Sequence, residues 1–217
     1  MSHVKPLAIG LGAATAKHEH LEKLVMTLRP DGPRAVDGDP SASRLPPDPA
    51  ASARLFLALW PSPDENQRLV RHLNDWSWRQ GSAVVQPDRL HLTLHFIGAL
   101  DRKRIAEVSA GLKVPMAPFE IRLTRAEMWP RGLAVLRPGE PPAALTQLHE
   151  RLAQALRALD LPIEARDFRP HVTLARRAAA STAPATPLQH IWRVSSYLLV
   201  DSAVGAGGAY HLLQRYD

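Results

Sequence analysis

The most informative parts of this 217-residue chain are two short stretches, LHLTLHFIG at residues 90–98 and RPHVTLAR at residues 169–176. Both contain the pattern His-apolar-Thr-apolar, at 91–94 and 171–174. Successive side chains of a β-strand point to opposite faces, so each pattern predicts a strand that buries two apolar residues and presents an imidazole and a hydroxyl on its other face. The composition predicts roughly 0.07 such tetrapeptides by chance, and two only about 0.003. The repetition therefore indicates a function.

Two histidines and two threonines form a set suited to chemistry at phosphorus. Imidazoles exchange protons near neutral pH, so one of His91 and His171 can accept a proton while the other donates one. The hydroxyls of Thr93 and Thr173 can donate hydrogen bonds to phosphate oxygens without adding charge. In such a displacement one histidine activates the nucleophile and the other protonates the leaving oxygen. The anionic transition state needs fixed donors, which the threonines and a nearby arginine can supply.

The spacing of His91 and His95 allows a metal site as an alternative, because two histidines four residues apart can bind zinc on a helix. On a strand, however, four residues span about 13 Å, which is too far for two ligands of one ion at about 2 Å. We therefore expect no metal and no cofactor. By strand alternation His95 shares the face of His91 and Thr93, so it is a possible contact in the same cleft. It could equally be a partly exposed strand residue.

Composition limits the class of protein and of partner. The chain has no Cys, which excludes a disulfide framework and a Cys nucleophile. Residues 1–53 contain six basic and six acidic residues, so the whole net charge of +6 lies in 54–217 and favours an anionic partner there. No apolar run approaches the roughly 20 residues that span a bilayer. We expect no membrane partner, a cytoplasmic location and a monomer.

Proline marks the main division of the chain. Residues 30–50 hold six Pro and two Gly, which is typical of a linker. We therefore expect 1–53 to be a disordered or partly helical appendage and 54–217 to be one folded domain. Within that domain, hydrophobic periodicity predicts an α+β fold with substantial antiparallel sheet. The expected strands are 54–60, 90–98, 119–129, 132–138, 170–176, 191–201 and 209–215, and the expected helices are 63–76, 102–112 and 141–162.

The tandem tetrapeptides resemble those of the two-histidine (2H) phosphoesterases, and most closely the branch of RNA 2′,3′-cyclic phosphodiesterases, also called 2′-5′ RNA ligases. The resemblance covers 54–217. It extends to the blocks RLFLALWPSPDENQRL (54–69), LHLTLHFIGAL (90–100), FRPHVTLAR (168–176) and SYLLVDSAVGAGGAYHLLQRYD (196–217).

This resemblance implies a bilobal fold, in which two pseudo-symmetric lobes of mainly antiparallel sheet with outer helices surround a central cleft. It implies metal-independent opening of a 2′,3′-cyclic phosphate, on an RNA end or a small nucleotide, to the 2′-phosphate. His91 would be the proton donor to ribose O3′, and His171 the proton acceptor that activates water. Thr93, Thr173 and Arg176 would hold the phosphate oxygens. The alternatives are 2′-5′ ligation by the reverse reaction and a non-catalytic nucleotide- or RNA-binding module.

Aromatic residues are the other candidate contacts. Some members of the family have an aromatic residue where this chain has Leu57, and such a ring can stack on a base. Trp129 precedes a predicted turn and is the best candidate for stacking on RNA. We expect Trp76, Trp78 and Trp192 to lie in the core. Three arginines near the second motif could form a basic rim for RNA or simply solvated surface: Arg166, Arg169 and Arg177.

Overall fold

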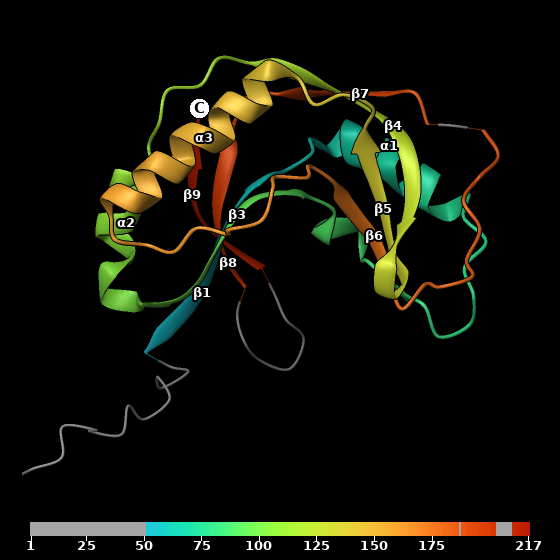
Figure 1. Ribbon diagram of the computed structural model, residues 1–217, viewed down its shortest axis with the longest axis horizontal. Helices are drawn as coiled ribbons and strands as arrows, with labels where there is room; N and C mark the ends of the chain where they lie inside the picture. Colours follow the sequence, from blue (N-terminus) through green and yellow to red (C-terminus); the bar gives the residue numbers. More distant parts are fainter. Residues whose placement is uncertain (1–50, 187, 203–209) are drawn as a thin grey trace, which may run out of the picture. The chain divides into compact units, whose positions relative to one another are not determined.

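The computed structural model describes residues 51–186, 188–202 and 210–217, which form an antiparallel sheet with α-helices packed on it (Figure 1). The strands are β1 Ser52–Leu59, β2 Ala83–Val84, β3 Leu92–Asp101, β4 Phe119–Trp129, β5 Leu133–Pro138, β6 Val172–Arg176, β7 His190–Val194, β8 Tyr197–Ser202 and β9 Tyr210–Tyr216. The α-helices are α1 Pro63–Asn74, α2 Ile105–Gly111 and α3 Ala143–Ala158. No helix in these three ranges is both long and apolar enough to cross a membrane.

The order of the strands places the two motifs at the centre of the sheet. It runs β7-β4-β5-β6-β3-β1-β8-β9, with β2 paired to β6, and every pairing is antiparallel. The first motif lies at β3 and the second at β6. We call the strands β3, β1, β8 and β9 the His91 half, and β6, β5, β4 and β7 the His171 half. The predicted α+β class with two related lobes is confirmed.

Strand β1 is buried on both faces, as its continuous apolar run predicts. Leu55, Leu57 and Leu59 belong to the main core. Phe56 and Ala58 point to the other face, where they pack with two residues of β8, Leu198 and Val200, in a second, smaller cluster. This second cluster is on the side of the sheet that carries the histidines of the motifs.

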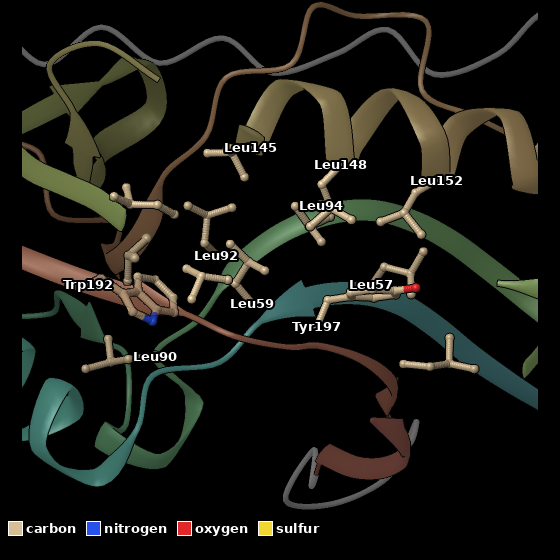
Figure 2. Close-up of a cluster of buried hydrophobic side chains, with 14 of the residues drawn as sticks. Leu57, Leu59, Leu90, Leu92, Leu94, Leu145, Leu148, Leu152, Trp192 and Tyr197 are labelled. Atoms are coloured by element: carbon tan, nitrogen blue, oxygen red, sulfur yellow. The ribbon is translucent and has the colours of Figure 1, made fainter. Parts of the chain in front are cut away.

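Helix α3 covers the core face of the central strands. Its leucine stripe, predicted from a spacing near 3.6 residues, points at β3 and β1, as Figure 2 shows for Leu145, Leu148 and Leu152. Leu92 and Leu94 of the first motif pack in the same core and are at most 2% exposed. Because this face is filled, His91 and Thr93 are left on the opposite one.

Helix α1 begins with the predicted capping box. Ser62 Oγ accepts a hydrogen bond from the backbone N–H of Glu65, and a carboxylate oxygen of Glu65 accepts from the backbone N–H of Ser62. The other oxygen of Glu65 accepts from the backbone N–H of Arg193 in β7, at 2.6 Å. The helix that follows β1 is therefore fastened to the edge of the His171 half.

The segment 191–201 and the start of the folded domain differ in how well the structure tests them. The predicted strand 191–201 is two strands in different halves, since β7 pairs with β4 and β8 pairs with β1. Alternation alone could not separate them, because both segments have buried apolar residues. The division at residue 53/54 stays a prediction: residues 1–50 lie outside the described residues, and the first described strand starts at Ser52.

Candidate active site

The two motifs lie side by side on the central strands. Leu92 of β3 pairs with Val172 of β6, and both are fully buried. In an antiparallel pair this register brings the histidine of each motif next to the threonine of the other. All four side chains, of His91, Thr93, His171 and Thr173, are partly exposed, whereas the apolar residues between them are buried. The predicted division of each tetrapeptide between two faces is confirmed.

Both histidines are oriented by the same backbone hydrogen bond. His91 Nδ1 lies 2.7 Å from the carbonyl oxygen of Arg89, and His171 Nδ1 lies 2.7 Å from the carbonyl oxygen of Arg169. A carbonyl can only accept, so each Nδ1 carries a hydrogen and donates it. In the neutral imidazole this leaves the lone pair on Nε2. Each Nε2 can therefore accept a proton, or donate one after it has been charged.

Aromatic rings surround His91. Trp60 stacks on it with ring centroids 5.0 Å apart and an angle of 8° between the planes. Phe56 lies at 5.1 Å, and Tyr210 at 5.5 Å with its edge toward the imidazole. Burial among these rings lowers the pKa of His91 to about 4, although the bond to the Arg89 carbonyl opposes the shift. His91 is therefore neutral at neutral pH in the free protein.

Arginines surround His171 instead. Burial is the main cause that lowers its pKa, and Arg166, Arg176 and Arg169 lower it further. The Trp129 ring lies against it, with centroids 4.7 Å apart, and the guanidinium of Arg169 lies 4.4 Å from the Trp129 ring centre. This places Trp129 beside the second motif. Whether it stacks on RNA stays a prediction.

A carboxylate fixes the indole of Trp129. Glu127 accepts a hydrogen bond from Trp129 Nε1 at 2.9 Å and forms an ion pair with Arg137 at 2.6 Å. Bonding to Arg137 lowers the pKa of Glu127 to about 2, so its charge is retained throughout the neutral range. The ring next to His171 is thus held by a charged pair.

Arg176 is the cation that acts on both histidines. Its charge lowers the pKa of His91 and also that of His171. A charge that affects both imidazoles lies within electrostatic reach of both, and the Arg176 side chain is exposed. Arg176 is therefore available to an anion bound at the histidines. The family resemblance implies this role for Arg176, and its contact with phosphate stays a prediction.

The structure places His95 away from this face, so His95 is neither the possible cleft contact nor the partly exposed strand residue that the sequence left open. The partner of Leu57 is His95, but the partner of the next residue, Ala58, is Thr93, so Leu94 is an extra residue in β3. This β-bulge reverses the alternation of faces after Thr93. His95 consequently points into the core and is 3% exposed, and Phe96 takes the position on the histidine face. His91 and His95 lie on opposite faces, so they do not share a metal ion.

The structure gives Leu57 a place in the core, so this chain has no ring on the histidine face at that position. Leu57 is fully buried in the main core, and the aromatic residue of β1 on the histidine face is its neighbour Phe56. Sequence analysis missed three residues around His91: Phe56, Trp60 and Tyr210. Alternation along β1 could have found the first two, because they are in phase with each other and opposite to the leucines. Tyr210 could not be found in this way, since it comes from β9.

The three tryptophans expected in the core are confirmed there. Trp76 and Trp192 are buried, and Trp78 packs against the main core and stacks on Trp76. His72 is buried and accepts a hydrogen bond from Trp76 Nε1. Among the residues described, no three side chains of His, Asp or Glu are arranged to bind one metal ion.

This chain is similar to known proteins in its sequence and in its fold. The family model described as the 2′-5′ RNA ligase superfamily matches residues 61–201. The RNA 2′,3′-cyclic phosphodiesterase of Escherichia coli is 31% identical over 75% of this chain and 95% of its own length. The protein of the same name from Thermus thermophilus is 29% identical, over 76% of this chain and 89% of its own length.

Solved structures agree with the sequence comparison. Escherichia coli LigT in its apo form has a TM-score of 0.67 and 26% identity, over 76% of this chain and 96% of that one. LigT complexed with 3′-AMP has a TM-score of 0.65 and 28% identity, over 76% and 97% of the two chains. With the family model covering more than half of its residues, the chain belongs to the 2′-5′ RNA ligase superfamily.

Proposed function

We propose that this protein opens 2′,3′-cyclic phosphates, on RNA ends or small nucleotides, to 2′-phosphomonoesters. The observation that carries the proposal is the pair of imidazoles on neighbouring strands, each with Nδ1 bonded to a carbonyl and Nε2 left for proton transfer. The names of the relatives support it, because five curated proteins that match this chain are called RNA 2′,3′-cyclic phosphodiesterase.

The proposed reaction is one displacement at phosphorus with two proton transfers. His171 Nε2 takes a proton from water while the water oxygen bonds to phosphorus. The bond from phosphorus to O3′ breaks, and His91 Nε2 gives its proton to O3′. The product has a 2′-phosphate and a free 3′-hydroxyl, and exchange with solvent returns both histidines to their starting states. Thr93, Thr173 and Arg176 hold the oxygens that carry the negative charge.

The proposed roles require His171 to be neutral and His91 to be protonated when the substrate is bound. In the free protein both pKa values are lowered, which suits a proton acceptor at His171. A proton donor at His91 needs a raised pKa, and a phosphate anion beside the imidazole provides this, because an opposite charge favours the protonated form. We infer that His91 gains its proton as substrate binds. None of these steps calls for a metal ion, so we infer metal-independent turnover.

The test is turnover of a nucleoside 2′,3′-cyclic monophosphate in EDTA by the wild-type protein and by His91→Ala and His171→Ala. We expect formation of the 2′-monophosphate and a loss of at least about 10²-fold in each variant, the usual contribution of a general acid or base. His211→Ala, which removes an exposed histidine of β9, is the matched control and should keep wild-type turnover.

Two results would contradict the proposal. Absence of turnover on both the nucleotide and an RNA with a cyclic-phosphate end would exclude the enzyme. Binding of the cyclic nucleotide that survives in both histidine variants, without turnover in any protein, would instead support a binding module.

A further inference from the structure

Three stacked rings lie behind the motifs, on the core face of the sheet. They belong to His95 in β3, His149 in α3 and Phe168 in the segment before β6. The ring centroids of His95 and His149 are 4.0 Å apart, and those of His149 and Phe168 are 3.9 Å apart. The angles between the planes are 17° and 13°, so the three rings form one nearly parallel stack. We call this set the rear stack.

A hydrogen bond fixes one end of the rear stack. His95 Nε2 lies 2.8 Å from the carbonyl oxygen of His149 and donates to it, because the carbonyl can only accept. His95 is 3% exposed, so this donor has little access to water. Strand β3 and helix α3 are therefore joined at this point by a ring contact and by a hydrogen bond.

The other end of the rear stack leads directly to the second motif. Phe168 is followed by Arg169, whose carbonyl accepts the hydrogen bond from His171 Nδ1 and whose guanidinium lies over Trp129. His95 follows Thr93 of the first motif by two residues. The stack thus connects the strand of one motif to the residue that orients the histidine of the other.

The sheet itself gives the motifs little mutual support. Among the described residues β3 and β6 are paired at one position, Leu92 with Val172, whereas β1 and β3 are paired at eight. The pairing of these two strands therefore contributes fewer hydrogen bonds to their spacing than the pairing of β1 with β3 does. A second connection is needed to hold the reacting groups within the small tolerance that proton transfer allows.

We propose that the rear stack positions His171 relative to His91, and that His95, His149 and Phe168 are positioning residues of the reaction. This inference rests on the proposed function. None of the three rings touches the substrate: they act by holding the carbonyl of Arg169 and the spacing of the motif strands. The stack exists only while its imidazoles are uncharged, so it also makes the site sensitive to acid.

The charges near the stack support this sensitivity. Burial lowers the pKa of His95, and it lowers the pKa of His149 to about 4, so both rings are neutral at neutral pH. Glu164 raises the pKa of His95 and Arg157 lowers it. When the pH falls toward 4, protonation of His149 places a positive charge in the stack, 4.0 Å from the His95 ring, and this charge opens the stack.

Two substitutions of His149 distinguish the effect of the ring from the effect of its protonation. His149→Phe keeps a flat ring that cannot be protonated, and His149→Ala removes the ring. For His149→Ala we expect kcat for a 2′,3′-cyclic nucleotide to fall at least about tenfold with KM changed less than about threefold, because misplacement of reacting groups acts on kcat. His149→Phe should stay within about twofold of wild type and keep more of its kcat between pH 5 and 4. His211→Ala is the control.

A spectroscopic measurement tests positioning without turnover. In ¹⁵N spectra of the neutral protein, His171 should be protonated at Nδ1 in the wild type and in His149→Phe. In His149→Ala it should change to a mixture of Nδ1 and Nε2 tautomers, because the Arg169 carbonyl has moved. If His149→Ala does not fold, Phe168→Leu removes a ring at nearly constant volume and should give the same change.

An unchanged His171 tautomer in a folded His149→Ala, or equal kcat in the Phe and Ala variants, would overturn the positioning role. Absence of turnover by the wild type would overturn the proposed function alone, because the tautomer measurement does not depend on it.

Discussion

The two halves of the site start from the same tetrapeptide and end in different surroundings. In the His91 half, three aromatic rings enclose the imidazole: Phe56, Trp60 and Tyr210. In the His171 half, one ring and three arginines stand near it. Both histidines keep the same hydrogen bond to a carbonyl two residues earlier. The local backbone therefore fixes the tautomer in both halves. Rings from β1, the residue after it and β9 surround His91, whereas the arginines near His171 belong to β6 and the segment before it.

This difference suggests a division of work in the proposed reaction. Rings around His91 bury part of the imidazole and favour its neutral form, so its protonation depends on the anion that binds. Arginines around His171 add positive charge where the anionic transition state forms.

The sharpest test separates the donor from the acceptor. A cyclic nucleotide with sulfur in place of the bridging O3′ has a leaving group that needs no proton donor. We expect His91→Ala to recover at least about 10²-fold of its lost rate on this substrate relative to the oxygen substrate, since that is the contribution of a general acid. His171→Ala should recover little. The reverse pattern in the measured rates would exchange the two roles.

Arg176 should contact an anion bound between the two histidines, because its charge affects both imidazoles. Arg176→Ala removes a charge-assisted contact, so we expect the 2′-monophosphate product to bind about tenfold more weakly. The measurement is competitive inhibition of turnover. Arg177→Ala, at the neighbouring exposed position, is the control and should change the inhibition constant less than about twofold. Equal effects of the two substitutions would show that Arg176 adds only to the general positive charge of the surface and makes no specific contact with the phosphate.

Removing one of the rings around His91 should bring the pKa of His91 closer to the ordinary value of a histidine. Burial lowers its pKa to about 4, so Trp60→Ala should raise the pKa by about one unit, which ¹H NMR titration can measure. Trp60→Phe, which keeps a ring, should change it less. In the wild type the unfolded chain binds the His91 proton near pH 6.5 and the folded chain only near pH 4. Stability is therefore lost as the pH falls between these values, and Trp60→Ala should lose less.

The smallest effect concerns the pair that holds Trp129. Glu127→Gln should lower the free energy of unfolding at pH 7 by about 1 kcal/mol, because the pair with Arg137 is partly exposed. The folded-state pKa of Glu127 is about 2, below its usual 4.5. The difference from wild type should therefore shrink as the pH falls from about 4.5 toward 2. Urea denaturation at several pH values measures it, and a constant difference would show that the charge is not the cause.

Much of the fold could be predicted because it depends on short-range patterns. The box around Ser62 and Glu65 predicts the start of α1, and the leucine spacing predicts α3, since both features act within a few residues. Alternation in the two tetrapeptides predicts which side chains are buried. The pairing of β3 with β6 was less accessible, because it joins segments about 80 residues apart.

His95 is a residue for which strand alternation predicts the wrong face. Its expected place followed from alternation along β3, and one extra residue at Leu94 reversed the faces. A bulge is a property of two paired strands, so it is visible only when the partner strand is known. The same reason explains the rear stack, whose rings come from a strand, a helix and a connecting segment.

The sequence by itself determined the residue types that do the proposed chemistry, because a strand of His-x-Thr-x presents them on one face whatever surrounds it. It also determined the α+β class through the periods of its apolar residues. Only the tertiary structure decided that the two motifs are neighbours, that aromatic rings from other segments lie around His91, and that His95 points to the core. Those properties depend on the packing of distant segments, and packing selects among arrangements that local patterns allow equally.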